Sequence, residues 1–142
     1  MYLNSLIRVD LTLILEKLIP VLQAQETVVG AYLFGSILGP CRQDSDIDVG
    51  LILKPGISYP DKELEKIQGK ILGKLSPLNN HPFDLVILNR ATAIFAYRVI
   101  SQGRLIYTSD DDAVTDFIEI VCRQRAENYP RYRQALESIV KG

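Results

Sequence analysis

Residues 33–53, LFGSILGPCRQDSDIDVGLIL, decide the fold of this chain of 142 residues. The stretch joins two apolar runs, 28–34 and 46–53, through a Gly-Ser step and a loop, and both runs are typical of buried strands. The second run opens with Asp46 and Asp48, although a buried carboxylate loses hydration that it does not easily recover. These two acidic residues therefore need an explanation beyond folding.

Alternation along a strand puts Asp46 and Asp48 on one face, with their Cα atoms about 6.6 Å apart at the usual rise of a strand. Two ionised carboxylates this close repel each other, and a divalent cation such as Mg²⁺ removes the conflict because it prefers oxygen ligands. The alternative is a strand end whose acids reach water or pair with lysine. The pair alone does not decide between a metal site and this alternative.

Gly35 and Ser36 directly follow the first strand. Glycine lets an anion approach the main chain, and a serine with the N–H groups after it offers hydrogen-bond donors to a phosphate. Because Gly39 and Pro40 follow, a helix that starts here is limited to one turn. An ordinary turn is the alternative, but the short loop back to Asp46 predicts that the Gly-Ser step and the acids face each other across a cleft.

A third carboxylate, Asp84, lies near the start of an apolar strand at 82–88. If this strand is the neighbour of strand 46–53, three carboxylates converge, and such a set can hold two metal ions about 3.5–4 Å apart. A structural role is the alternative for Asp84 taken alone. Together with the Gly-Ser turn, the three acids Asp46, Asp48 and Asp84 predict a catalytic metal site.

The rest of the chain alternates between helical and extended patterns. Helices are predicted at 5–24, 60–75, 91–102 and 110–142, and a short strand at 104–108. This order indicates one domain, residues 1–142, of the α/β or α+β class, with a mixed sheet flanked by helices and a core at 28–108. In the first helix, Pro20 is expected to kink or split the helix. The inward stripe of that helix is predicted to be Leu11, Leu15, Leu18 and Leu22.

Composition describes an ordinary globular protein with a formal net charge of −1. That balance argues against binding to nucleic acid through bulk charge. No apolar stretch is long enough to span a bilayer, and no charged region leads into a signal sequence. Cys41 and Cys122 suit neither a disulfide framework nor a zinc ligand set. We therefore expect a cytoplasmic protein that does not associate with membranes.

In this combination the motifs resemble the nucleotidyltransferase superfamily with the DNA polymerase β-like palm. They are most similar to its minimal members, the MNT-domain proteins found beside HEPN-domain partners in bacteria and archaea. The family pattern is a hydrophobic residue with Gly-Ser, a loop, Asp-x-Asp and a later strand acid. The matching residues are Phe34, Gly35 and Ser36, then Asp46, Ile47 and Asp48, then Asp84.

The resemblance implies that Asp46, Asp48 and Asp84 bind two Mg²⁺ ions, with Mn²⁺ as an alternative, and that Gly35 and Ser36 hold the β- and γ-phosphates of ATP. It implies transfer of AMP and release of pyrophosphate. The implied acceptor is a tyrosine of a HEPN-domain ribonuclease toxin, for which this chain is the antitoxin. Two other functions stay open: an antitoxin that acts by binding alone, and a nucleotidyltransferase for small molecules.

The loop after the Gly-Ser step departs from the family pattern. Many minimal members carry an arginine there, as in Gly-Ser-x-Ala-Arg-Gly. This chain has Ile37, Leu38, Gly39 and Pro40 instead, and its loop arginine is Arg42. Either Arg42 contacts the phosphates or triphosphate binding is weaker.

Two further features each allow a structural and a functional interpretation. The segment RQRAENYPRYR, residues 123–133, interleaves arginine with tyrosine, a composition that favours protein interfaces, although a solvated helical face is the alternative. The lone histidine, His81, is interpreted as a loop residue without a catalytic role.

Overall fold

A computed structural model describes the backbone of residues 5–141 and the side chains of residues 5–127. Its elements follow one another as α1 (Leu11–Gln23), β1 (Val28–Phe34), η1 (Ser36–Leu38), β2 (Ile47–Leu53), α2 (Asp61–Leu72), β3 (Phe83–Ile87), η2 (Leu88–Arg90), α3 (Ala93–Gln102), β4 (Arg104–Thr108) and α4 (Asp111–Lys141). The predicted order of helices and strands is confirmed, and the two 3₁₀ turns, η1 and η2, are additions to it.

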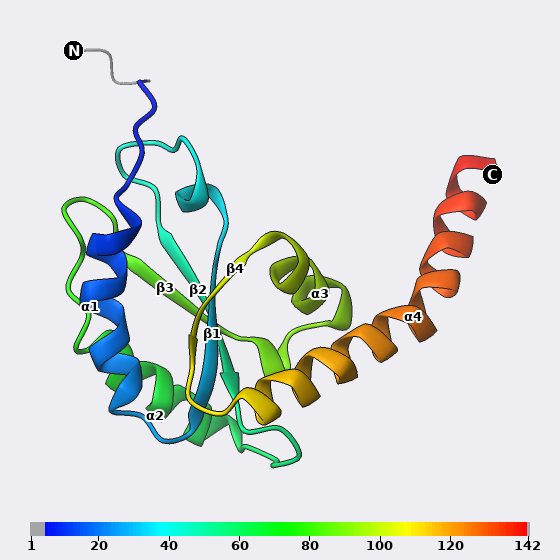
Figure 1. The fold of residues 1–142 in the computed structure, drawn as a ribbon. Helices are drawn as coiled ribbons and strands as arrows, with labels where there is room; N and C mark the ends of the chain where they lie inside the picture. The colour runs from blue at the N-terminus through cyan, green and yellow to red at the C-terminus, as the bar shows by residue number, and fades with distance from the viewer. Residues whose placement is uncertain (1–4, 142) are drawn as a thin grey trace.

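A single four-stranded sheet, in the order β3-β2-β1-β4, forms the centre of the molecule (Figure 1). β1 pairs antiparallel with β2 and with β4. β2 pairs parallel with β3, and α2 supplies the crossover that parallel neighbours need. The sheet is therefore mixed, as the sequence predicts.

Two hydrophobic clusters fill the opposite faces of this sheet. α1 and α2 pack on one face, against alternate residues of β2 such as Ile47, Val49 and Leu51, all of them fully buried. α3 and α4 pack on the other face, where Ile52 and Leu88 enter the second cluster. Figure 1 shows the two pairs of helices on the two sides of the sheet. The even-numbered residues of β2 therefore belong to the α3 and α4 side.

α1 begins at the N-cap Asp10, whose carboxylate accepts a hydrogen bond from the Thr12 N–H at 2.9 Å. The fully buried side chains of this helix are Ile14, Leu18 and Leu22. The predicted stripe is thus wrong at one position: Leu11 packs against the core as predicted, but Ile14 takes the place of Leu15 one turn before Leu18.

Proline does not interrupt the helices in this chain. α1 continues through Pro20, and the expected split is wrong. Pro20 lies on the exposed side of α1, where water can bind the carbonyl group that loses its partner. α4 likewise continues through Pro130.

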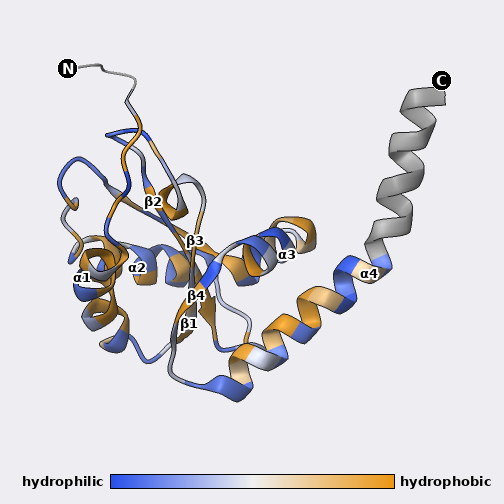
Figure 2. Cartoon of the chain, turned by 45° about the horizontal axis from the view of Figure 1, so that its top comes forward, coloured by the Kyte–Doolittle hydropathy of each residue, from blue (hydrophilic) through white to orange (hydrophobic). Residues whose placement is uncertain are grey.

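α2 and α4 each bury one apolar face. In α2, the buried residues are Leu64, Ile67 and Ile71, and hydrophobic and hydrophilic residues alternate along α4 (Figure 2). The side chains of residues 128–133, half of the arginine- and tyrosine-rich segment, lie outside those that the structure describes. Within its described part, the Arg125 guanidinium stacks over the Tyr97 ring, 4.3 Å from the centroid.

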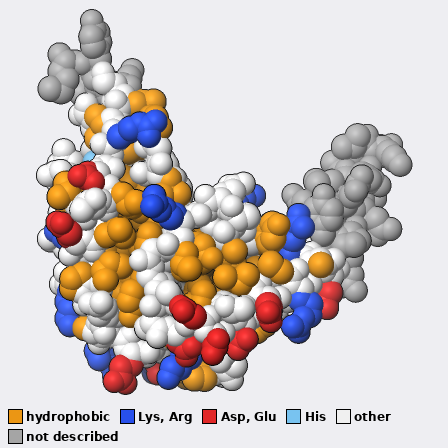
Figure 3. Space-filling view, in the orientation of Figure 1, with side chains coloured by type: hydrophobic (Ala, Val, Ile, Leu, Met, Phe, Trp, Pro, Cys, Tyr) orange, Lys and Arg blue, Asp and Glu red, His pale blue; other side chains and the backbone are white. Residues whose placement is uncertain are grey.

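An apolar surface covers the side of the molecule on which β4 and α4 lie. Figure 3 shows hydrophobic side chains gathered there, with acidic side chains along their lower border. β4 is an edge strand, and its Leu105 is 42% exposed. Among residues 5–141, no helix is long and apolar enough to cross a membrane.

We expect Ile71→Ala to lower the free energy of unfolding by about 2–4 kcal/mol, because it removes a fully buried side chain. Leu72→Ala is the matched control on the same turn. Leu72 is 40% exposed, so its loss should change stability by less than about 1 kcal/mol. Urea denaturation measures both values, and equal losses would contradict the assigned inward face of α2.

Candidate functional site

The carboxylates of Asp46, Asp48 and Asp84 converge at one end of the sheet. In the parallel pairing of β2 and β3, Asp48 lies directly opposite Asp84, so both side chains leave the same face. Asp46 precedes β2 and lies two residues before Asp48. One oxygen from each of the three carboxylates lies within 4.8 Å of the others. The predicted meeting of the three acids is confirmed as a matter of geometry.

The electrostatics of this cluster oppose the ionisation of its central member. Asp48 is partly buried, whereas Asp46 and Asp84 are exposed. Burial raises the pKa of Asp48 above its ordinary value, and the negative charges of Asp84 and Asp46 raise it further. The charged form of Asp48 is therefore stabilised by any cation that binds between the three groups.

Gly35 closes the other side of the cluster. Its φ of +83° lies in the left-handed region, which side chains other than that of glycine rarely allow. A Cβ atom at this position would lie 2.5 Å from the Oδ2 atom of Asp48. Glycine is therefore required at position 35 for two reasons: the backbone conformation of the turn, and the space that the Asp48 carboxylate occupies.

The turn after Gly35 has the predicted length. Ser36 begins η1, a single 3₁₀ turn that ends at Gly39, and Ser36 itself is exposed. Because Phe34 pairs with Asp48 across β1 and β2, the Gly-Ser step and the acid cluster share one end of the sheet. The Gly-Ser step and the acids are thus neighbours, and the expected cleft between them stays a prediction.

The segment before β3 holds the backbone on both sides of Asp46. The buried His81 ring donates from Nδ1 to the carbonyl oxygen of Ser45 at 2.7 Å. One residue later, the Pro82 carbonyl accepts a hydrogen bond from the Ile47 N–H at 2.8 Å. The loop interpretation of His81 omitted this contact, and the only signal in the sequence is its position three residues before Asp84.

Arg42 does not have the surroundings of a phosphate ligand in this structure. Its side chain is 81% exposed, and its Nε atom lies 3.5 Å from the carboxylate of Asp44. The described contacts therefore tie Arg42 to its own loop, and its predicted role in nucleotide binding stays a prediction.

A pocket of about 440 Å³ includes Gly35 in its lining but none of the three acids. Its walls come from β1, from η1 and from one side of α3. They are formed mainly by Phe34, Gly35, Leu38, Phe95, Arg98 and Gln102. Phe34 and Phe95 pack edge to face, with ring centroids 5.8 Å apart. The pocket is thus apolar on one wall and offers the donors of Arg98 and Gln102 on another.

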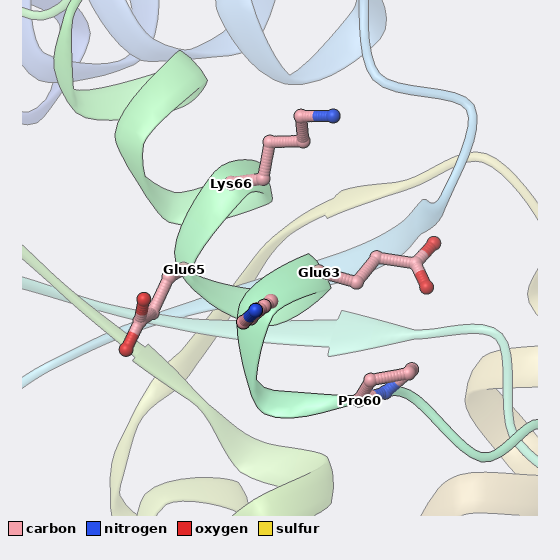
Figure 4. A pocket seen from close by; sticks show the side chains of 5 residues that line it. Pro60, Glu63, Glu65 and Lys66 are labelled. Atoms are coloured by element: carbon pink, nitrogen blue, oxygen red, sulfur yellow. The ribbon is translucent and has the colours of Figure 1, made fainter.

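A second hollow, at the start of α2, lacks these features. It is lined by Pro60 and by charged residues of both signs, whose side chains point in different directions (Figure 4). α2 follows the end of β2, so this hollow lies at the end of the strand away from Asp48. It has no convergent polar groups, and the chemistry is expected at the acid cluster.

The donor set of the cluster fits a hard divalent cation. Its three ligand groups are all carboxylates, which Mg²⁺ and Mn²⁺ prefer, and it includes no thiolate or imidazole. Next to it, Gly35 leaves the backbone open to a bulky anion. The arrangement can hold a metal-bound phosphate between the acids and the turn.

Comparison with known proteins agrees with this geometry. Residues 16–112 match the family model described as "Polymerase beta, Nucleotidyltransferase". None of the curated proteins matches the sequence significantly.

Solved structures share the fold. A chain in a toxin–antitoxin complex with AMP-PNP has a TM-score of 0.64 and 21% identity, over 90% of this chain and 98% of that chain. A chain of the toxin–antitoxin complex MntA–HepT has a TM-score of 0.62 and 21% identity, over 92% and 99%. The same score and identity hold, over 92% and 98%, for a complex of tri-AMPylated Shewanella oneidensis HEPN toxin with MNT antitoxin.

We expect Asp48→Asn to raise the melting temperature of the metal-free protein at neutral pH. Because the pKa of Asp48 is raised by folding, its charge opposes folding above the folded pKa. The gain should shrink as the pH falls through that pKa and vanish below the unfolded pKa.

Thermal melts in EDTA measure this gain, with Asp44→Asn as the control because Asp44 lies on the surface and pairs with Arg42. Added Mg²⁺ should stabilise the wild type more than Asp48→Asn. An equal rise in melting temperature for Asp48→Asn and Asp44→Asn in EDTA would contradict the assigned repulsion within the cluster.

Proposed function

Because the chain belongs to the polymerase β nucleotidyltransferase family, we propose that it transfers AMP from ATP to a tyrosine of a HEPN-domain toxin and so acts as an antitoxin. The observation that carries the proposal is the convergence of Asp46, Asp48 and Asp84 next to Gly35. In this family such a set is what a metal-dependent transfer of a nucleotide needs.

Each group of the site has a part in the proposed reaction. Asp46, Asp48 and Asp84 would hold two divalent ions, and Gly35 and Ser36 would contact the β- and γ-phosphates. When bound, the ions neutralise phosphate charge and lower the pKa of the attacking hydroxyl. The raised pKa of Asp48 fits this part, because binding a cation relieves the repulsion that burial and its neighbours create.

At the α-phosphorus, the transfer forms one P–O bond and breaks another. The tyrosine oxygen attacks the α-phosphorus, and the bond from that phosphorus to the oxygen bridging it to the β-phosphate breaks. Pyrophosphate leaves with the electron pair, and the hydroxyl proton passes to Asp84, which is exposed at the edge of the cluster. Positioning and charge neutralisation supply most of the rate.

A protein acceptor is supported by two observations. The surface over β4 and α4 is apolar and exposes Leu105, as a docking partner requires. The solved structures that share the fold include complexes with HEPN toxin, and one of those toxins is tri-AMPylated.

A binding-only antitoxin is the second candidate, and the loop after the Gly-Ser step favours it. That loop carries no arginine before Arg42, whose side chain is exposed and paired with Asp44. Weak triphosphate binding would leave neutralisation of the toxin to contact alone.

Incubation with labelled ATP, Mg²⁺ and the protein that the adjacent gene encodes tests the transfer. We expect a mass gain of one or more AMP groups on a tyrosine of that protein. The double variant Asp46→Asn, Asp48→Asn should lower the labelling rate at least about 100-fold, because several kcal/mol of charge stabilisation is lost. Asp44→Asn, outside the cluster, should label at the wild-type rate.

Three results would contradict the proposal in different ways. Neutralisation of the toxin by the double variant, without label, would favour the binding-only antitoxin. Label on an aminoglycoside-like compound in place of protein would favour a small-molecule transferase. Full labelling by the double variant would show that the transfer does not need Asp46 and Asp48.

A further inference from the structure

We propose that Arg98, on α3, binds the pyrophosphate end of the nucleotide and compensates for the lack of an arginine in the loop after the Gly-Ser step. The inference rests on the proposed function, because it assigns a residue to the triphosphate that the site would bind. Three features of the structure support it: the need for a cation, the position of Arg98 and its lack of a carboxylate partner among the described residues.

The site needs positive charge beyond its metal ions. Three carboxylates and a triphosphate carry more negative charge than two divalent ions neutralise. Charge also builds on the leaving pyrophosphate as the bond to the α-phosphorus breaks. A cation near the turn after Gly35 would stabilise both the bound triphosphate and this developing charge.

Arg98 is placed to supply that cation. It lines the pocket of about 440 Å³ together with Gly35 and with Leu38 of η1. Gly35 also borders the acid cluster, since its Cβ position is 2.5 Å from Asp48 Oδ2. One extended ligand can therefore contact the metal site and the pocket at once, with the turn between them.

Two side chains of the pocket, Arg98 and Gln102, offer hydrogen-bond donors to a phosphate. Phe34 and Phe95 pack edge to face against each other, as a wall rather than as a pair of open faces for stacking. Arg98 and Gln102 are four residues apart on α3, so they share one helix face and both offer N–H donors. Arg98 is exposed, and its guanidinium matches a phosphate in charge and in its fork-shaped donor geometry.

Arg98 also differs from Arg42 in its ionic partners. Within the described part of the chain, the two ion pairs are those of Arg42 with Asp44 and of Arg90 with Asp61. The Arg98 side chain has no carboxylate partner there. Its charge is therefore uncompensated next to the Gly-Ser turn.

Isothermal titration with MgATP, Mg-pyrophosphate and AMP tests the assignment. Arg98→Gln should weaken binding of MgATP and of Mg-pyrophosphate at least about tenfold, because a charge-assisted contact is lost, and leave AMP binding within about twofold. Arg98→Lys should fall between Arg98→Gln and the wild type, since it keeps the charge and loses the fork. Mn²⁺ binding without nucleotide should be the same in all three proteins.

Arg123→Gln, which removes an exposed arginine of α4, is the control for overall charge and should bind all three ligands like the wild type. Unchanged pyrophosphate binding in Arg98→Gln would overturn the inference and leave the proposed function intact. The inference would also be overturned if Arg98→Gln weakened AMP binding as much as pyrophosphate binding, or if Arg42→Gln weakened pyrophosphate binding more than Arg98→Gln did. A wild type that binds no MgATP would overturn the proposed function as well.

Discussion

The parallel pairing of β2 with β3 is the constraint on which the site depends. It sets Asp48 directly opposite Asp84, and a slip of one residue would turn one of these carboxylates toward the core under α1 and α2. The register is maintained by Val49 and Leu85, which must enter that core from the same two strands. Hydrophobic burial thus aligns two acids that repel each other. A cation bound between them would relieve this electrostatic repulsion.

Much of this arrangement follows from local sequence patterns. Alternation along a strand is a local rule, so it was enough to predict that Asp46 and Asp48 share a face. Strand order depends on contacts between distant segments. The sequence therefore predicts that Asp84 joins the other acids only if strand 82–88 is the neighbour of strand 46–53. In α1 the neighbours Ile14 and Leu15 are both apolar, and periodicity alone could not tell which of them faces the sheet.

The contacts that the sequence could not reveal join segments far apart in the chain. His81 donates a hydrogen bond to Ser45 across the start of the sheet, and Arg98 lines the same pocket as Gly35 because α3 packs against β1. Neither residue belongs to a motif with its partner. A lone histidine in a loop and an arginine in an amphipathic helix read as ordinary positions until the fold brings their neighbours beside them.

The division of the sheet into two faces has a consequence for how such a protein can change over time. The acids lie on the α3 and α4 side, while the core under α1 and α2 lies behind the strands. Substitutions in the core under α1 and α2 affect mainly stability, whereas substitutions of exposed residues around the acids alter what the protein recognises. A lineage can therefore exchange most of its interior, and an engineer can strengthen that interior, without redesigning the chemistry on the opposite surface.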